Sequence, residues 1–584
     1  MQTQTMTQKS AVFQAARTRK ADRTAKAAGS GRWFLIGFAI PALIMLVGYV
    51  QIGVWPFGDG TVLIIDSLHQ YLPFYTEFHE KLVHHSSLLY SFSAGLGYNF
   101  WATYAYYLAS PLNFLIGLVP TANVCDFMDY LILLKVALCG GTMTWYLHRR
   151  NPKSGLLAPA FGTMYAVSFF MIGYYFNIMW LDSIAMLPLI MKGIDQIFGI
   201  GAGGRVSGRS DGRLYGAALF VALWCNYYIG FMLCLFSVLY VFVCLVYTGR
   251  MKPGLLLRRF LRFFWYSILA GGMGSIVLLP AYRALKASES MQSNTFPKVI
   301  KFYTDFVNLC LAHFAGIKPV NISNSQVGLN AYCGVSVMLL GILFLLDNRI
   351  ALRRRIAKGI LAGFLFLSFS MNVLNYIWHG FHQQNGLPNR FAFIYIAIVL
   401  VMSFDAIADV PKLAVWRILA AGVIPISFAA AAWYLELGQD NEGNAYPVSA
   451  YEITFLLLCG YLVLLLVIRL YHIRRLVFSV LAGSILICES GVSAVWGVVC
   501  NDSVTRSIYL NDQKSYKTLV PQMHDNTWFR SEVDSQRMRD VTLFCGGNAV
   551  VMFNSTMQES VTNFCDRIGM ESRTNKTATT GSRN

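Results

Sequence analysis

Long apolar runs alternate with short polar turns along most of the chain, from Arg32 to Cys500. Each run approaches the roughly 20 residues that a helix needs to cross a bilayer. Only helices and closed barrels satisfy their backbone in lipid, and the runs lack the alternating pattern of strands. The pattern predicts an all-α polytopic membrane protein. The expected spans, about 13 in number, are residues 33–54, 124–147, 155–175, 182–199, 211–226, 229–247, 263–282, 331–346, 359–375, 391–408, 418–435, 452–470 and 476–499.

Composition supports this class and limits the partners. The chain is 56% hydrophobic and 13% charged, against roughly 25% charged residues in soluble proteins. Its formal net charge of +18 sits mainly in turns beside apolar runs, where the positive-inside rule and anionic lipids account for it. We therefore expect a lipid bilayer as partner and no nucleic acid. The 12 cysteines show no paired metal spacing, and a disulfide among Cys500, Cys545 and Cys565 is left open.

The basic turns set the orientation and the domain organisation. With the amino terminus inside, the five strongest basic turns all fall in the cytoplasm; they are residues 148–153, 204–213, 249–262, 349–358 and 471–475. Residues 1–32 are then a basic, flexible cytoplasmic arm. Residues 33–499 form the transmembrane domain, with an outer loop at 55–123. Residues 500–584 form a small extracytoplasmic segment, in which 540–547 and 548–555 read as short strands.

Residues 103–120 are apolar enough to span, but counting them would move the basic turn at 148–153 outside. Pro111 interrupts the segment, and Ser110 and Asn113 are polar. We interpret it as a re-entrant or interfacial helix at the outer mouth. The alternative is a true span with inverted later topology, because orientation rules have exceptions.

On this map ionisable residues gather on the outer face. Such groups at a membrane boundary are costly and invite a functional interpretation. Asp66 opens a predicted amphipathic helix at 66–82, where it is equally suited to capping and to catalysis. Asp59 lies in a Pro-Phe-Gly-Asp-Gly turn, where a turn-stabilising role competes with ligand binding. The other outer ionisable residues are Asp182, His379 and Arg390.

Two further features of the outer face carry chemistry. Arg390 follows the turn residues of the loop at 378–393, and a guanidinium suits bidentate recognition of phosphate. An arginine that only extends to the interface is the competing explanation. The three histidines of 79–85 lack the companion ligands of a zinc site, so we expect an interfacial polar surface there and no metal site.

Several segments together resemble the YfhO family of bacterial multi-pass membrane proteins. The resemblance is carried, in the order of the family, by GDGTVLIIDSLHQYLPF (58–74), SAGLGYNFWATYAYYLASPLNFL (93–115), MIGYYFNIMWLDSIAMLPLI (171–190), NYYIGFMLC (226–234) and WHGFHQQNGLPNRFAF (378–393). It implies a C-type glycosyltransferase (GT-C) architecture. It also implies transfer of a sugar from a polyprenyl-phosphate carrier to an extracytoplasmic cell-envelope glycopolymer, such as lipoteichoic or wall teichoic acid.

In GT-C enzymes an acidic residue of the first outer loop serves catalysis. The resemblance maps that role onto Asp66, with Asp59 in reserve, and Arg390 would stabilise the departing phosphate. A divalent cation such as Mg²⁺ or Mn²⁺ is left open. The expected substrate-binding residues are His69, Gln70, Tyr71, Asn177, Asp182, Asn226, His379 and Arg390.

The resemblance weakens at the carboxyl end. The family usually continues into a larger outer domain and further apolar segments, whereas this sequence finishes in a low-complexity tail at 572–584. We therefore expect residues 500–584 to be an incomplete domain. A lipid or glycolipid transporter and an inactive envelope scaffold are the competing functions. Transporters favour internal repeats and mid-membrane polar residues, neither of which is evident here.

Overall fold

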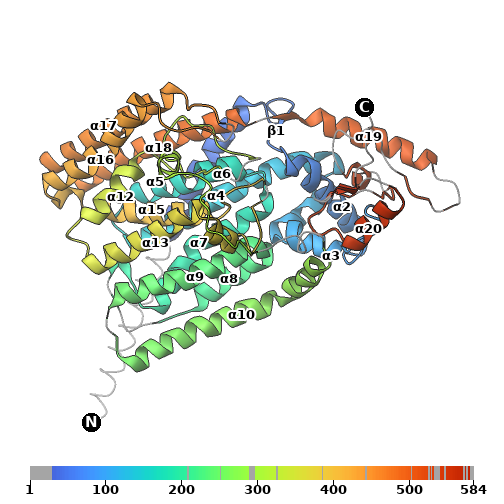
Figure 1. The fold of residues 1–584 in the computed structure, drawn as a ribbon, viewed down its shortest axis with the longest axis horizontal. Helices are drawn as coiled ribbons and strands as arrows, with labels where there is room; N and C mark the ends of the chain where they lie inside the picture. The colour runs from blue at the N-terminus through green and yellow to red at the C-terminus, as the bar shows by residue number, and fades with distance from the viewer. Residues whose placement is uncertain are drawn as a thin grey trace, which may run out of the picture.

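A computed structural model describes residues 29–578, with gaps at 205, 207–209, 250, 289–295, 324–326, 385, 441–442, 502, 524–526, 528, 532–539, 545–546, 551, 570–571 and 574–576. Most of the arm expected at 1–32, and most of the tail at 572–584, therefore lie outside the described residues. The described chain is dominated by helices that run along the long axis of the molecule (Figure 1). After the first helix, Gly29–Gln51, the long helices are α4 (Val124–Arg150), α5 (Leu157–Ala166), α6 (Phe169–Tyr174), α7 (Ile178–Ile197), α8 (Arg213–Cys225), α9 (Tyr227–Thr248), α10 (Pro253–Lys286), α12 (Ser336–Leu346), α13 (Leu352–Ser370), α15 (Ala392–Ile407), α16 (Val415–Tyr434), α17 (Val448–Leu470) and α18 (Arg475–Cys500).

Every predicted span overlaps a helix: 155–175 covers the consecutive helices α5 and α6, and 359–375 covers α13 and the start of α14 (Asn372–Trp378), with a break at Met371. Seven helices of the described chain are long and apolar enough to cross a membrane by length and composition. Shorter apolar helices are α8, α12 and α15. The prediction of a mostly helical, multi-span protein is confirmed, whereas the number of crossings and the orientation stay predictions.

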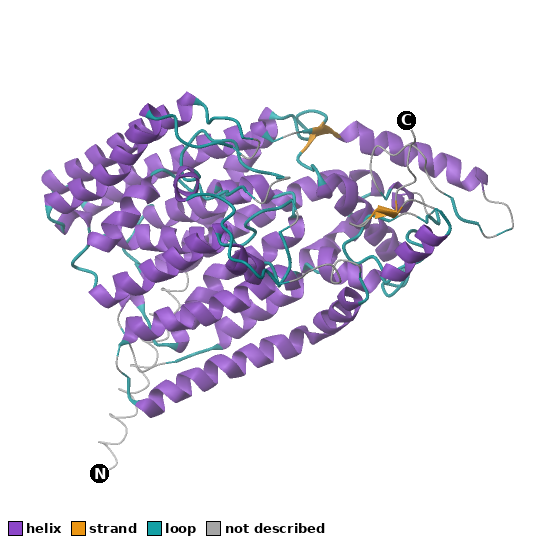
Figure 2. Cartoon of the chain, viewed as in Figure 1, coloured by secondary structure: helices purple, strands orange, loops and turns teal. Residues whose placement is uncertain are grey.

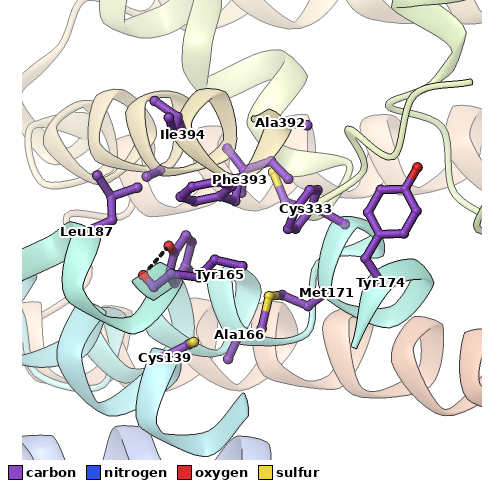
Figure 3. Packing of buried hydrophobic residues seen from close by; sticks show 14 of the residues in the cluster. Cys139, Tyr165, Ala166, Met171, Tyr174, Leu187, Cys333, Ala392, Phe393 and Ile394 are labelled. Carbon is purple, nitrogen blue, oxygen red and sulfur yellow. Dashed lines mark hydrogen bonds between the residues drawn. The ribbon is translucent and has the colours of Figure 1, made fainter. Parts of the chain in front are cut away.

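The centre of the bundle is packed from side chains of α4, α5, α6, α7 and α15 (Figure 3). Every residue of α15 except Asp405 is buried, which is the pattern of a helix surrounded by protein on all sides. Phe170 of α6 and Phe393 of α15 have ring centroids 5.5 Å apart. The Tyr165 hydroxyl donates to the Ile184 carbonyl at 3.0 Å (Figure 3), so this buried polar group is satisfied.

Short helices and strand pairs gather at one end of the bundle. This end, called the outer end after the predicted topology, holds α2 (Leu72–Val83), α3 (Phe100–Thr103), α19 (Arg506–Met523) and α20 (Glu559–Arg567) (Figure 1). Helix α10 reaches it from the opposite end and packs against α3. The described strands form two short pairs (Figure 2). β1 (Gly60–Thr61) pairs antiparallel with β2 (Val504–Thr505), which joins the first outer loop to the segment after α18.

Two local predictions change at the outer end. Val541–Phe544 form a 3₁₀ turn and the described part of 548–555 forms no strand, so the strand prediction for 540–555 is wrong. Residues 103–120 fold as a π-helical turn, η2 (Tyr104–Leu108), followed by a 3₁₀ helix, η3 (Pro111–Leu118). The segment is therefore not a single α-helical span. This agrees with the re-entrant interpretation. The break falls at Ser110 because Pro111 cannot donate a backbone hydrogen bond.

The topology predicts which exposed positions a membrane-impermeant maleimide reaches. We expect a cysteine at Ser87, in the exposed loop after α2, to react in intact cells. A cysteine at the exposed Lys153, in the turn after α4, should react only after permeabilisation. The unsubstituted chain gives the background from its own cysteines. Labelling of Lys153→Cys but not of Ser87→Cys in intact cells would show that the orientation is inverted.

Candidate active site

Asp66 stands directly before a π-helical turn, η1 (Ser67–Tyr71), which continues into α2. The backbone of Asp66 is already helical, with φ −64° and ψ −29°, and its side chain makes no capping hydrogen bond. A capping residue has a non-helical backbone and a side-chain oxygen that accepts from a helix amide. The capping interpretation of Asp66 is therefore wrong. Single π turns inside helices are frequent at functional sites, which fits the catalytic interpretation.

Tyrosines from two π turns meet beside Asp66. The ring centroids of Tyr71, from η1, and Tyr107, from η2, are 5.3 Å apart, and Tyr106 lies 4.6 Å from Tyr107. Burial raises the pKa of the Tyr71 hydroxyl well above its ordinary value, and the nearby Asp66 carboxylate raises it further. The Arg390 guanidinium acts in the opposite direction on the pKa of Tyr71. Tyr71 is thus within electrostatic range of both charged candidates.

Arg390 occupies a buried position among aromatic rings. Its guanidinium carbon lies 5.3 Å from the Tyr228 ring centroid and 5.7 Å from that of Trp180. Its Nη2 and Nε donate to the carbonyls of Gln384 and Leu387, at 2.7 and 3.1 Å. Arg390 is 7% exposed, so it does not extend to the interface as the competing explanation requires. Its position fits a cation presented to a desolvated anion.

His379 supports the backbone of this arginine. Burial and the Arg390 charge lower the pKa of His379 well below its ordinary value, so the imidazole is neutral. The Arg390 N–H points at Nε2, 3.4 Å away, which leaves Nδ1 to donate to the Asn375 carbonyl at 2.7 Å. His379 is fully buried. These contacts place His379 between the backbones of Arg390 and Asn375.

Two asparagines attach the bundle to the tyrosine cluster. Tyr71 donates to Asn177 Oδ1 at 2.9 Å, just before α7. Asn226 caps α9 by accepting from the Ile229 amide at 2.9 Å, and it donates to the Tyr106 carbonyl at 3.1 Å. Both predicted residues therefore lie at the site. They hold the tyrosines rather than project past them.

Asp182 belongs to a separate buried ion pair. Its Oδ2 is 2.7 Å from Nζ of Lys135, and its Oδ1 accepts from Ser110 at 3.0 Å. Lys135 also donates to the Ile178 carbonyl at 3.3 Å. The pair joins α4 and α7 to the break between η2 and η3. This arrangement accounts for the polar Ser110 in an otherwise apolar segment.

Asp59 and Gln70 attach the outer loop to residues beyond α18. The Asp59 carboxylate accepts from the amide and the hydroxyl of Ser507, at 3.1 and 2.6 Å, at the start of α19. Gln70 donates to the Phe553 carbonyl at 2.7 Å. His69 is half-buried on η1, in the turn that follows Asp66. The contacts of Asp59 with Ser507 are those of a structural residue. They lie outside the tyrosine cluster.

Helix α2 is more deeply buried than an interfacial amphipathic helix. Residues Leu72–His79 are all buried, so the prediction of a solvent-facing polar side is wrong for this stretch. Glu77 is 5% exposed and accepts hydrogen bonds from Ser91 and Tyr98. Burial raises the pKa of Glu77 above its ordinary value, against the opposing effect of these two hydrogen bonds. The outer loop itself covers the helix.

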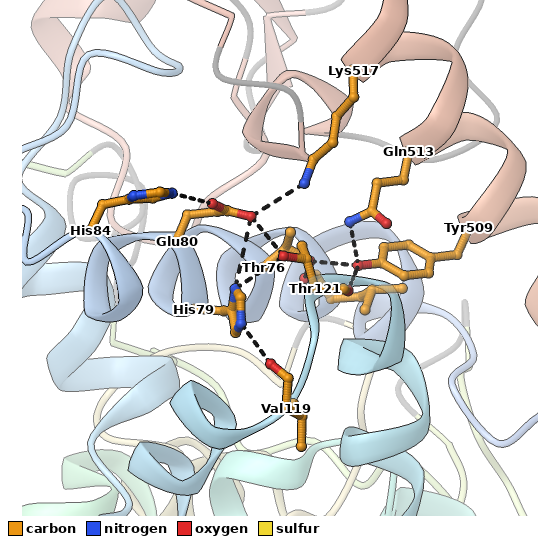
Figure 4. A network of polar contacts seen from close by, with 10 residues as sticks. Thr76, His79, Glu80, His84, Val119, Thr121, Tyr509, Gln513 and Lys517 are labelled. Carbon is orange, nitrogen blue, oxygen red and sulfur yellow. Dashed lines mark hydrogen bonds and ion pairs between the residues drawn. The ribbon is translucent and has the colours of Figure 1, made fainter.

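A polar network fixes α2 to α19 (Figure 4). Oε1 of Glu80 accepts from Thr121 at 3.0 Å and lies 3.3 Å from Nζ of Lys517. His84 lies 3.2 Å from the other carboxylate oxygen of Glu80, and His79 contacts the Val119 carbonyl at 2.8 Å. These contacts account for the histidine-rich sequence. Within the described residues, no group of three or more His, Cys, Asp or Glu side chains could hold a metal ion.

Sequence reasoning missed several residues of this region. Lys135 is a lone charge inside the apolar run LILLKVALCGG (131–141), and that isolation was a usable signal. Tyr106, Tyr107, Trp180 and Tyr228 offered none, because aromatic residues are common at membrane interfaces. Of the three cysteines for which a disulfide was left open, Cys500 and Cys565 are free, and Cys545 lies outside the described residues.

We expect Lys135→Met to destabilise the protein strongly. Removing one partner leaves the buried Asp182 carboxylate without its cation, which typically costs about 3–5 kcal/mol of unfolding free energy. The measurement is reversible unfolding of the purified protein in detergent. The matched control is Lys135→Met with Asp182→Leu, which removes both charges and should recover most of the loss. Equal losses in both variants would contradict the assignment of this pair.

The Glu80 contact should make the docking of α19 depend on acid pH. Burial acts to raise the pKa of Glu80, but the Lys517 charge and the Thr121 hydrogen bond hold it below its ordinary value of 4.5. A lowered folded-state pKa means that the contribution is complete above the ordinary pKa and is lost as pH falls through the folded value. Hydrogen exchange of α19, corrected for intrinsic rates, should therefore rise below about pH 4. Glu80→Gln should remove that step, and an unchanged step would contradict this role.

Comparison with known proteins identifies the family. The model of the family described as bacterial membrane protein YfhO matches residues 37–584. Among curated proteins, none matches the chain. Two solved structures are similar at low identity: ArnT from Cupriavidus metallidurans bound to undecaprenyl phosphate, with 12% identity and a TM-score of 0.39, and the same protein in the apo state, with 11% and 0.40. Each alignment covers 88% of this chain and 84% of the other. Because the family model covers nearly the whole chain, this multi-pass membrane protein belongs to the YfhO family of bacterial membrane proteins.

Proposed function

We propose that the chain is a membrane glycosyltransferase that uses a polyprenyl-phosphate-linked sugar. The observation that carries the proposal is the joint placement of Asp66 and Arg390 around Tyr71, whose hydroxyl both charges influence. A carboxylate and a guanidinium that both act on one buried tyrosine hydroxyl would provide a base and a phosphate-binding group in the same site. Membership of the YfhO family supports the same reaction class.

The proposed reaction is a direct displacement at the anomeric carbon of the donor sugar. The acceptor hydroxyl oxygen forms the new bond to that carbon while the bond to the phosphate oxygen breaks. Asp66 takes the hydroxyl proton, and the polyprenyl phosphate leaves with the bonding electrons. Arg390 stabilises the negative charge of this leaving group. The site shields both steps from water, since Tyr71 and Tyr107 are buried.

The acceptor that we propose is an extracytoplasmic cell-envelope glycopolymer, lipoteichoic or wall teichoic acid. The predicted orientation supports it, because it places Asp66 on the outer face. The resemblance to the family supports it as well. Asp59 is the reserve candidate for the base, although its contacts with Ser507 favour a structural role.

The test compares two carboxylates of the same outer loop. We expect Asp66→Asn to lower the transfer rate about 100-fold or more, because a positioned general base contributes about 10²–10⁴-fold. Asp59→Asn is the matched control, since its amide oxygen can still accept from Ser507, and it should keep most of the activity. The readouts are the sugar content of teichoic acid in cells at equal expression and transfer by the purified protein from a polyprenyl-phosphate sugar.

Unchanged glycosylation in both variants would overturn the catalytic assignment. Loss in Asp59→Asn alone would move the base to Asp59. Loss in both at equal expression and equal thermal stability would leave a role for each carboxylate in the reaction.

A further inference from the structure

A charged cavity lies at the end of the bundle opposite the outer site. Its volume is about 280 Å³. It is lined by the ends of helices and turns that the sequence places in three different cytoplasmic loops: Arg150 and Asn151, Gly203 and Gly204, and Arg349 to Lys358. The fold therefore brings separate basic turns together around one space. Asp405 and Asp409, at the end of α15, complete its polar lining.

Two of the four cations in the lining are paired with one carboxylate. Nε and Nη2 of Arg150 donate to the two oxygens of Asp405, at 2.6 and 2.7 Å. Nζ of Lys358 lies 2.7 Å from Asp405 Oδ2. Arg150 and Lys358 are buried, and a bidentate pair of this kind is rigid. This group forms a preorganised floor for the cavity.

The remaining cations have weaker compensation. Arg354 stacks on Tyr247, with its guanidinium carbon 3.9 Å from the ring centroid, and Nη2 donates to the Gly204 carbonyl at 3.0 Å. Its Nε is buried and has no hydrogen-bond partner in the described part of the chain. Arg349 is 4.0 Å from Asp409 and is 40% exposed. The lining therefore holds two more positive than negative groups, one of them with an unsatisfied donor.

The positive-inside rule accounts for basic residues in these turns, but it requires only that they face the cytoplasm. It does not account for buried ion pairs in the lining of one cavity. It also does not account for Arg354, which stacks on Tyr247 and whose Nε–H has no partner in the described part of the chain. A buried donor without a partner is unfavourable, and an anion in the cavity would satisfy it. Basic pockets between transmembrane helices on the cytoplasmic side are known to suit phosphorylated lipid headgroups.

We propose that this cavity is a binding site for a phosphate-bearing anion, with Arg354 as its principal ligand. Arg349 closes the site from the solvent side, and the group of Arg150, Lys358 and Asp405 holds its floor. The site lies at the opposite end of the bundle from Asp66, and it does not depend on the proposed transfer reaction. The phosphate can come from the headgroup of an anionic membrane lipid or from a soluble phosphate compound.

The test measures binding to the full-length protein in detergent by isothermal titration calorimetry. The probes are dihexanoyl phosphatidylglycerol, the zwitterionic dihexanoyl phosphatidylcholine, and inorganic phosphate. The key variant is Arg354→Gln. Its matched control is Arg353→Gln, which removes the same charge from the adjacent, exposed residue of α13 that does not line the cavity. Arg349→Gln serves as a second cavity variant if Arg354→Gln fails to fold.

We expect the wild type to bind the anionic lipid or inorganic phosphate, and Arg354→Gln to bind it about 10-fold more weakly or worse, as the loss of a charged hydrogen bond implies. Arg353→Gln should stay within about 2-fold of the wild type. Binding of phosphatidylglycerol but not of inorganic phosphate identifies a headgroup site, and the reverse identifies a soluble ligand. Binding of neither probe, equal binding of both lipids, or equal loss in the two α13 variants would overturn the proposal.

Discussion

The structure depends on one constraint: backbone polar groups that leave a helix cannot be exposed to lipid. At the outer end the chain meets it by covering irregular segments with other parts of the protein. The π turn η2 packs against α2 and α10, and the 3₁₀ helix η3 packs against α2. The polar break at Ser110 is closed by Asp182 and Lys135, since the hydroxyl and the ammonium both bind the same carboxylate. The irregular backbone between η2 and η3 is thereby stabilised by side chains of two long helices, α4 and α7.

The same covering sets the electrostatics of the candidate active site. Because the outer loop folds over itself, Tyr71 and Tyr107 are buried next to a carboxylate and a guanidinium. Charges act more strongly there than they would at an exposed interface. The neutral His379 adds no second positive charge beside Arg390, so the guanidinium remains the principal cation of this cluster.

Hydropathy alone predicted the helices well, because burial in lipid imposes a length and an apolar composition that each segment carries by itself. The site was predicted in part. The outer loop and the loop before α15 were identified as its sources, and Asn177, Asn226 and His379 do lie around the cluster of Tyr71 and Arg390. Asp182 was assigned to the same site, and the structure adds that it pairs with Lys135. Local sequence cannot show this, because the partner lies 47 residues away on another helix.

Three local predictions failed: the cap at Asp66, the polar face of α2 and the strand at 541–544. Asp66 was given an equal prospect of capping, but its backbone is already helical and its side chain makes no capping hydrogen bond. The polar face expected on α2 was read from spacing, whereas Glu77 is satisfied inside the protein by Ser91 and Tyr98. The segment at 541–544 is apolar and strand-like in composition, but it packs on α2 as a 3₁₀ turn. For α2 and for 541–544, contacts distant in sequence decided the outcome.

Contacts between the outer loop and the rest of the chain fix the position of the candidate site. η1 is held to the bundle by Asn177, and η2 is held by Asn226. The loop is also attached to the segment after α18, because Asp59 binds Ser507 and β1 pairs with β2. Catalytic groups act efficiently only when their supporting residues fix them within a fraction of an ångström. Residues beyond α18 are therefore part of the support of Asp66, and they connect the geometry of the site to a segment that lies more than 400 residues away in sequence.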